Sequence, residues 1–220
     1  MSKFYWNTTL PILQEVLNRI KAEAAFAPFR LVGETSLSLQ LGHRMSDDID
    51  LFTDHLYGSI DFDGIDKYLR DSFSYVTPQS PGPIGMGHSY MVGNNGGKAV
   101  KLDLYYTDAF VQQPIVINGL KMATVEEIAA MKIDIVQRMA RKKDFYDLHE
   151  ILDKLSLRNL IELHKQRYPY SHDEDLILKN FTDFSKAEED FDPICLKGKH
   201  WELIRWDLVT IYEQFIESNQ

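Results

Sequence analysis

Strand patterns end near residue 123 of this 220-residue chain, and only helical patterns follow. Before that point, short apolar runs bounded by Gly, Pro and Asn alternate with amphipathic segments, as in a sheet covered by helices. After it, apolar residues recur every three or four positions, which predicts packed helices. We therefore expect an α+β fold, in which a mixed sheet with flanking helices (residues 1–123) is followed by a C-terminal helical domain (residues 124–220).

The predicted elements follow from the same periodicities. The segment 35–41 fits either a strand or a short helix, and we favour a helix because the better strand pattern lies directly behind it at 49–53. Strands are further expected over 29–32, 90–92, 100–106 and 115–117, and helices over 8–24, 60–72, 124–140, 144–152, 156–167, 172–180 and 201–215. Thr124 with Glu127 forms the pattern of a capping box, and Asp144 is expected to cap the helix that follows.

Charge and composition exclude several classes of protein. The chain has 24 Lys and Arg against 33 Asp and Glu, a formal charge of −9, which disfavours binding to duplex DNA. No apolar run approaches the roughly 18 residues of a membrane span, and no secretory signal is recognisable at the start. Cys195 is the single cysteine, so no internal disulfide is expected. These features predict a cytoplasmic protein that does not bind membranes.

Two aspartates at one predicted strand are the sharpest chemical signal. Residues two apart in a strand point to the same face, so Asp48 and Asp50 should present their carboxylates side by side, with Ile49 on the buried face. Two adjacent carboxylates repel unless a cation lies between them, and Mg²⁺ prefers such oxygen ligands. The alternative is a pair of solvated aspartates, because the Asp-x-Asp pattern is short and often accidental.

A third carboxylate lies in a second predicted strand. Asp103 stands between apolar residues, where an aspartate needs a cation or a hydrogen-bond partner. If the two strands are neighbours, three carboxylates converge, and three can hold two metal ions about 4 Å apart. We therefore interpret Asp48, Asp50 and Asp103 as a metal site that binds two Mg²⁺ ions for phosphoryl or nucleotidyl transfer.

Further residues fit a triphosphate substrate. Gly33 ends a predicted strand just before a helix, where free backbone N–H groups could face phosphates, and Thr35 and Ser36 add hydroxyl donors. Lys132, among apolar neighbours of a long helix, could meet a phosphate or only extend its ammonium to solvent. Asp144 and Asp147 could orient Lys132 or Arg138, or cap a helix.

In combination, three segments of the chain resemble the AbiEii/AbiGii toxin family of nucleotidyltransferases, within the DNA polymerase β-like superfamily. The segments are Leu31–Phe52 (LVGETSLSLQLGHRMSDDIDLF), Thr124–Lys132 (TVEEIAAMK) and Arg141–Leu148 (RKKDFYDL). They occur in the family's order, and the strand with Asp103 falls where a third carboxylate is expected. Each segment alone is unspecific.

The resemblance implies a Mg²⁺-dependent nucleotidyltransferase, often the toxin of a type IV toxin–antitoxin pair. It implies that Asp48 and Asp50 bind metal, that Lys132 binds the triphosphate and that Asp144 is the matching acidic residue of the helical segment. Arg44 is a further candidate for neutralising the nucleotide. The expected partners are an NTP, an RNA or protein hydroxyl as acceptor, and a cognate antitoxin.

One residue departs from the family's pattern. Glu34 follows the first glycine where the family usually has Gly or Ser, and a carboxylate there would repel a triphosphate. Two alternatives therefore stay open. The chain could be a nucleotide-binding pseudoenzyme, or it could transfer phosphate rather than a nucleotide.

Overall fold

A computed structural model describes residues 4–77, 80–81 and 85–219 of the chain. By compactness the chain divides into two units, one made of Met1–Gln40 with Ser46–Thr124 and the other of Leu41–Met45 with Val125–Gln220. The second unit thus includes a five-residue segment from the first half of the sequence. Each unit is described by itself below.

The first unit is built on one mixed sheet. Its described strands lie in the order β3-β5-β6-β2-β1-β8-β7, with β4 paired to β5. The pairs β2–β6 and β1–β8 are parallel, and the other pairs are antiparallel. The strands are β1 (Arg30–Leu31), β2 (Asp48–Thr53), β3 (Tyr75–Val76), β4 (Ser80–Pro81), β5 (Gly87–Asn95), β6 (Lys98–Tyr106), β7 (Ile115–Ile117) and β8 (Leu120–Met122).

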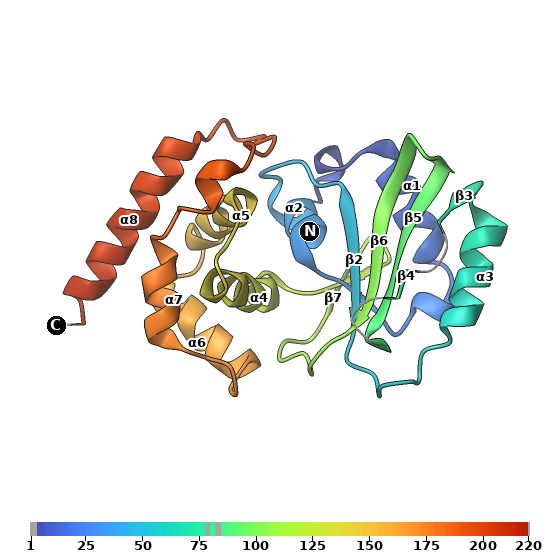
Figure 1. The fold of residues 1–220 in the computed structure, drawn as a ribbon, viewed down its shortest axis with the longest axis horizontal. Helices are drawn as coiled ribbons and strands as arrows, with labels where there is room; N and C mark the ends of the chain where they lie inside the picture. Colours follow the sequence, from blue (N-terminus) through green and yellow to red (C-terminus); the bar gives the residue numbers. More distant parts are fainter. Residues whose placement is uncertain (1–3, 78–79, 82–84, 220) are drawn as a thin grey trace. The chain divides into compact units, whose positions relative to one another are not determined.

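The helices of this unit lie on both sides of the sheet (Figure 1). They are α1 (Pro11–Ile20), α2 (Gly33–Leu41), whose last residue belongs to the second unit, and α3 (Phe62–Ser72), with short 3₁₀ turns at Trp6–Thr8 and Ala24–Phe26. The apolar residues of α1 and α3, such as Leu13, Leu17 and Leu69, form one buried cluster with the apolar face of the sheet. Burying this face leaves the opposite face of β2 and β6 to polar side chains.

The second unit is helical apart from its short segment Leu41–Met45. Its described helices are α4 (Val125–Gln137), α5 (Lys142–Leu152), α6 (Leu157–Arg167), α7 (Glu174–Phe181) and α8 (Trp201–Glu217), with a 3₁₀ turn at Ala187–Glu189. The backbone of Ile194–Leu196 runs beside His43–Met45, because Met45 N–H donates to the Ile194 carbonyl and Leu196 N–H to the His43 carbonyl. In the part of the chain that the structure describes, no helix is long and apolar enough to cross a membrane.

The expected α+β architecture is confirmed, and so is the helix favoured over 35–41. Strands β3, β4 and β8 were not expected; each is only two or three residues long and is defined by its pairing, β3 and β4 with β5, and β8 with β1 and β7. The helix expected over 8–24 is shorter, with Leu10 at its N-cap and Lys21 at its C-cap. Asp144 is the third residue of α5 rather than its cap, which is Arg141.

Candidate active site

Four charged residues share one face of the sheet in the first unit. In the parallel pair β2–β6, Asp48 lies opposite Lys101 and Asp50 opposite Asp103. Residues 48, 50, 101 and 103 are partly or fully exposed, whereas their neighbours Ile49 and Leu102 are buried. The two strands are therefore neighbours, and three aspartates and one lysine lie on the same surface.

Asp103 is held by donors from two strands. Its carboxylate accepts a hydrogen bond from the Ser89 hydroxyl at 2.6 Å and forms an ion pair with the Lys101 ammonium, also at 2.6 Å. Ser89 lies opposite Asp103 on β5, and its hydroxyl also contacts the Tyr105 hydroxyl at 2.8 Å. These contacts fix the position of the Asp103 carboxylate.

Gly33 begins α2 directly against Asp50. Its φ of +65° lies in the left-handed region, and a Cβ built at this position would come within 2.3 Å of the Asp50 Oδ2 atom. Any side chain at residue 33 would thus displace the Asp50 carboxylate and strain the backbone. The glycine turn and the carboxylates therefore form a single arrangement, in which only glycine fits.

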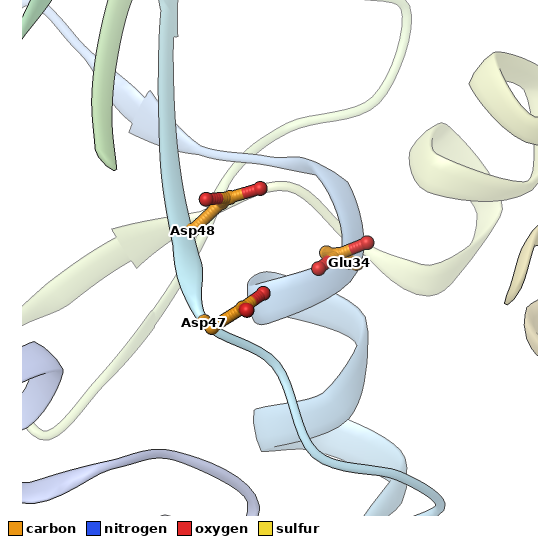
Figure 2. A group of neighbouring side chains, drawn as sticks. All are labelled: Glu34, Asp47 and Asp48. Atoms are coloured by element: carbon orange, nitrogen blue, oxygen red, sulfur yellow. The ribbon is translucent and has the colours of Figure 1, made fainter. Parts of the chain in front are cut away.

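Glu34 points to the carboxylates rather than away from them. Figure 2 shows its side chain, in the first turn of α2, beside those of Asp47 and Asp48 at the start of β2. One oxygen from each of the three carboxylates lies within 4.8 Å of the others, and Glu34 is only 6% exposed. The Ser46 hydroxyl also donates to Glu34 at 3.3 Å. Residue 34 therefore adds negative charge to the site.

The charge of this cluster changes the pKa of Asp50. Burial, followed by the neighbouring carboxylates of Asp103, Glu34 and Asp48, raises the pKa of Asp50 from 3.8 to about 7, although Lys101 acts in the opposite direction. A carboxyl group with so high a pKa binds a proton or another cation readily at neutral pH. This electrostatic need is what a bound divalent cation would satisfy.

The hydroxyl groups expected to bind triphosphate are fully buried. The Thr35 hydroxyl contacts the Ser46 hydroxyl at 2.6 Å and donates to the Asp48 carbonyl, which ties the first turn of α2 to the start of β2. The Ser36 hydroxyl accepts a hydrogen bond from the Gln40 amide at 3.1 Å. These contacts shape the glycine turn, and direct contact of Thr35 and Ser36 with nucleotide stays a prediction.

Lys132 lies in the second unit, in a cluster of buried ions. Its side chain is 5% exposed, and its ammonium contacts Asp144 at 2.8 Å and Asp147 at 2.5 Å. Burial alone would lower the pKa of Lys132, but Asp144 and Asp147 outweigh it and raise the pKa above its ordinary value. Lys132 is therefore a permanent cation of fixed position. Asp144 also accepts the Arg141 N–H at 3.1 Å, which fixes it to the start of α5.

Arg44 and His43 complete the same cluster from the segment Leu41–Met45. The Arg44 guanidinium binds both oxygens of Asp147, through Nε at 2.7 Å and Nη2 at 2.9 Å, and the His43 Nε2 atom lies 2.7 Å from the Asp147 Oδ1 atom. Arg44 is 2% exposed. A contact between Arg44 and nucleotide stays a prediction, whereas its ion pair explains why the second unit includes this segment.

Sequence reasoning did not assign roles to three residues that the structure places in these clusters. Lys101 could have been found, because it stands two residues before Asp103 and must share its face. Asp47 precedes the strand, so the alternation of side chains along the strand did not predict where the Asp47 side chain points. Ser89 lies on another strand, and only the β5–β6 register places it beside Asp103.

Comparison with known proteins gives a family match over most of the chain. The family model described as "Nucleotidyl transferase AbiEii toxin, Type IV TA system" matches residues 15–209. An uncharacterized protein of Aquifex aeolicus (strain VF5) is 28% identical over 93% of this chain and 96% of its own length.

Solved structures share the fold at lower identity. A putative nucleotidyltransferase from H. pylori is 21% identical, with a TM-score of 0.58 over 94% of this chain and 96% of that one. The nucleotidyltransferase toxin MenT4 from Mycobacterium tuberculosis H37Rv is 17% identical, with a TM-score of 0.57 over 91% of this chain and 81% of that one. At such identities the likeness shows the fold alone.

Proposed function

This chain belongs to the AbiEii family of nucleotidyltransferase toxins, a family of enzymes, and we propose that it transfers a nucleoside monophosphate from an NTP to a hydroxyl group of RNA or protein. Membership of the family confirms the resemblance recognised in the sequence. The observation that supports the reaction best is that Asp48, Asp50 and Asp103 lie on one face of neighbouring strands, with Asp50 directly against the Gly33 turn.

The donor set fits Mg²⁺. All the candidate ligands are carboxylate oxygens, which hard divalent cations prefer, and the raised pKa of Asp50 reflects negative charge that a cation would compensate. We propose Asp48, Asp50 and Asp103 as the residues that hold Mg²⁺. When bound, the ion would neutralise charge on the phosphates and lower the pKa of the attacking hydroxyl.

The remaining roles concern this chain's own groups. In the proposed reaction the acceptor oxygen bonds to the α-phosphorus, the bond to the pyrophosphate oxygen breaks, and Asp103 accepts the hydroxyl proton. The Gly33 turn gives the triphosphate a surface of backbone without a side chain. Lys132, whose charge Asp144 and Asp147 maintain, is proposed to contact the triphosphate, as the family resemblance implies.

Glu34 favours a second candidate function. Its carboxylate adds charge beside Asp48, where it would repel a triphosphate, so the chain could bind nucleotide weakly and not react. We propose instead that Glu34 faces the cation rather than the phosphates, because its oxygens lie with those of Asp47 and Asp48. The variants Glu34→Gly and Glu34→Gln separate the two candidates.

The testing experiment uses purified protein, each α-labelled NTP in turn, Mg²⁺ and total cellular RNA, with Asp48→Asn as the inactive control. We expect label in RNA or in protein that the control lacks. The γ-labelled NTP should leave no label on the acceptor, whereas label from the γ-position alone would indicate a phosphotransferase. A Glu34→Gly variant that gains activity over an inactive parent would establish the second candidate.

The assay should include the antitoxin encoded beside the gene, where one exists. As a member of a toxin family the chain is expected to have such a partner, and the donor NTP suggests a cytoplasmic setting. We expect the antitoxin to lower the incorporation of label. Equal incorporation with and without that partner would contradict direct inhibition.

A further inference from the structure

A cavity of about 410 Å³ lies in the first unit, beside the end of α1, the 3₁₀ turn Ala24–Phe26 and the β7–β8 hairpin. This volume falls within the roughly 300–1,000 Å³ that is usual for small-molecule sites. Its walls are mainly apolar, and they include the buried side chains of Leu17, Ile20, Phe26, Phe29, Leu31 and Leu120. The cavity can therefore shield a hydrocarbon group of a ligand from water.

The cavity is separate from the proposed metal site. Leu51 contributes to its wall from β2. Successive side chains of a strand point to opposite faces, so Leu51 points away from the face that bears Asp48 and Asp50. Among the described residues that line the cavity, none belongs to the proposed metal site. The proposed reaction therefore gives the cavity no role.

Two lysines line the cavity and connect its walls. Lys21, at the C-cap of α1, donates from its ammonium to the Asn118 carbonyl at 3.0 Å, in the turn between β7 and β8. Lys121, on β8, donates from its ammonium to the Ala27 carbonyl, also at 3.0 Å. An ammonium group has three N–H donors, so each lysine retains donors for a further acceptor.

These two lysines carry their charge without an ion pair. In the described part of the chain neither has a carboxylate within 4.0 Å of its ammonium, although the whole chain has a formal charge of −9. The carboxylate of Glu23, which also lines the cavity, accepts a hydrogen bond from the Ala25 N–H instead. Burial, followed by the positive charge of Arg30, lowers the pKa of Lys121, although Asp54 acts in the opposite direction. An anionic group of a ligand would favour the charged form of Lys121.

We propose that this cavity binds an apolar monocarboxylate, with the hydrocarbon chain against the apolar walls and the carboxylate hydrogen-bonded to Lys21 and Lys121. Each methylene group buried against the walls tightens binding about fourfold. A hydrogen bond between an ammonium and a carboxylate adds about tenfold. The ligand therefore needs both parts, because a neutral alcohol lacks the charge and a shorter acid lacks the apolar area. Neither metal nor nucleotide takes part in this binding.

The test measures the binding of octanoate to the full chain, free of metal and nucleotide, by isothermal titration calorimetry. Hexanoate, with two methylene groups fewer, tests the apolar walls, and octan-1-ol tests the charge. A double variant with Lys21→Met and Lys121→Met removes both ammonium groups at similar side-chain length. Lys98→Met is the matched control, because Lys98 is an exposed lysine of β6 outside the cavity wall. Ala24→Trp, at an exposed position of the wall, fills the cavity with a large side chain.

We expect octanoate to bind at one site in the wild type and in Lys98→Met. Hexanoate and octan-1-ol should each bind the wild type about tenfold more weakly. The lysine double variant should bind octanoate about as weakly as octan-1-ol, and Ala24→Trp should not bind it. The two single lysine variants show how much of the loss belongs to each ammonium. Circular dichroism checks that the variants are folded.

Three results would overturn the inference. The first is no binding of octanoate to the wild type, and the second is octan-1-ol binding as tightly as octanoate. The third is an octanoate affinity that is unchanged in both the lysine double variant and Ala24→Trp, which would place the ligand elsewhere. None of these results bears on the proposed function, whose assay follows transfer from labelled NTP.

Discussion

Replacing Asp147 by asparagine should destabilise the second unit more than any change at its surface. Asp147 is fully buried and is contacted by the His43, Arg44 and Lys132 side chains. The substitution keeps the size of the side chain but removes its charge. Asp144 would then be the one carboxylate still in contact with Lys132 among the ion pairs of the described residues.

The magnitude follows from burial and hydrogen bonding. Breaking a buried ion pair by removing one partner costs about 3–5 kcal/mol, because the other charge stays buried without compensation. Asparagine worsens the contact further, because either orientation of its amide places an N–H group against donors of Arg44 or Lys132. We therefore expect the free energy of unfolding to fall by about 3–5 kcal/mol, a large part of the usual 5–15 kcal/mol.

Urea titration at pH 7 with tryptophan fluorescence would measure this loss. Trp201 lies in the same unit, is 4% exposed and stacks on Tyr146, so its emission reports unfolding of this unit. Trp6→Phe and Trp206→Phe remove the other two tryptophans. Asp153→Asn is the matched control, since its side chain is 61% exposed and its ion pair with Lys199 is worth less than about 1 kcal/mol.

The stabilisation that Asp147 provides should also depend on pH in a defined direction. Burial would raise the pKa of Asp147, but Arg44, Lys132 and the hydrogen bond from His43 outweigh it and hold that pKa well below 3.8. A carboxyl group with a lowered pKa stabilises the folded state above its unfolded pKa, and loses this effect as the pH falls through the folded value. The difference between wild type and Asp147→Asn should therefore be constant from pH 8 to pH 5 and shrink only in stronger acid. A loss below about 1 kcal/mol at pH 7 would refute the reasoning.

Three further predictions follow from the same structure. Asp50→Asn should raise the melting temperature of the metal-free protein at pH 8, because the pKa of Asp50 is raised and its ionisation costs stability as the pH rises toward and past 7. The same substitution should abolish stabilisation by Mg²⁺. Differential scanning fluorimetry measures both effects. Gly33→Ala should weaken Mn²⁺ binding, as measured by electron paramagnetic resonance of the free ion. Gly58→Ala is the control, because Gly58 also has a positive φ of +80° but a Cβ there would meet nothing within 4 Å. It should lower the free energy of unfolding in urea by only about 1 kcal/mol and leave Mn²⁺ binding intact. Burial, and then the charge of Arg138, lower the pKa of His164 from 6.5 to about 4. The wild type should therefore lose about 3 kcal/mol of stability between pH 7 and pH 4. Urea unfolding midpoints measured across this pH range should not show this loss in His164→Leu.

Much of the fold was predictable because the signals are local. The alternation of Ile49 and Leu51 with polar residues marks β2, and apolar residues at three- and four-residue spacing mark α4 to α8. The direction of the Asp48 and Asp50 side chains follows from the same alternation. In each case a residue's role depends on neighbours a few positions away, so the order of residues is enough to predict it.

Other features depended on pairing between distant segments. The contact of Asp103 with Ser89 requires the β5–β6 register, and the ion pair of Arg44 with Asp147 joins residues 103 positions apart. From its position in the sequence, Glu34 was expected to repel the triphosphate. Its side chain lies beside Asp48 because α2 begins next to the start of β2. No local pattern contains this information.

By itself, the sequence determined the family, the α+β architecture and the presence of an acidic strand after a glycine turn, because motif spacing and periodicity are properties of short segments. Tertiary structure alone decided which charges meet: Lys101 with Asp103 in one unit, and Lys132 with Asp147 in the other. The physical reason is that the interaction between two charges depends on their separation and burial in the folded chain.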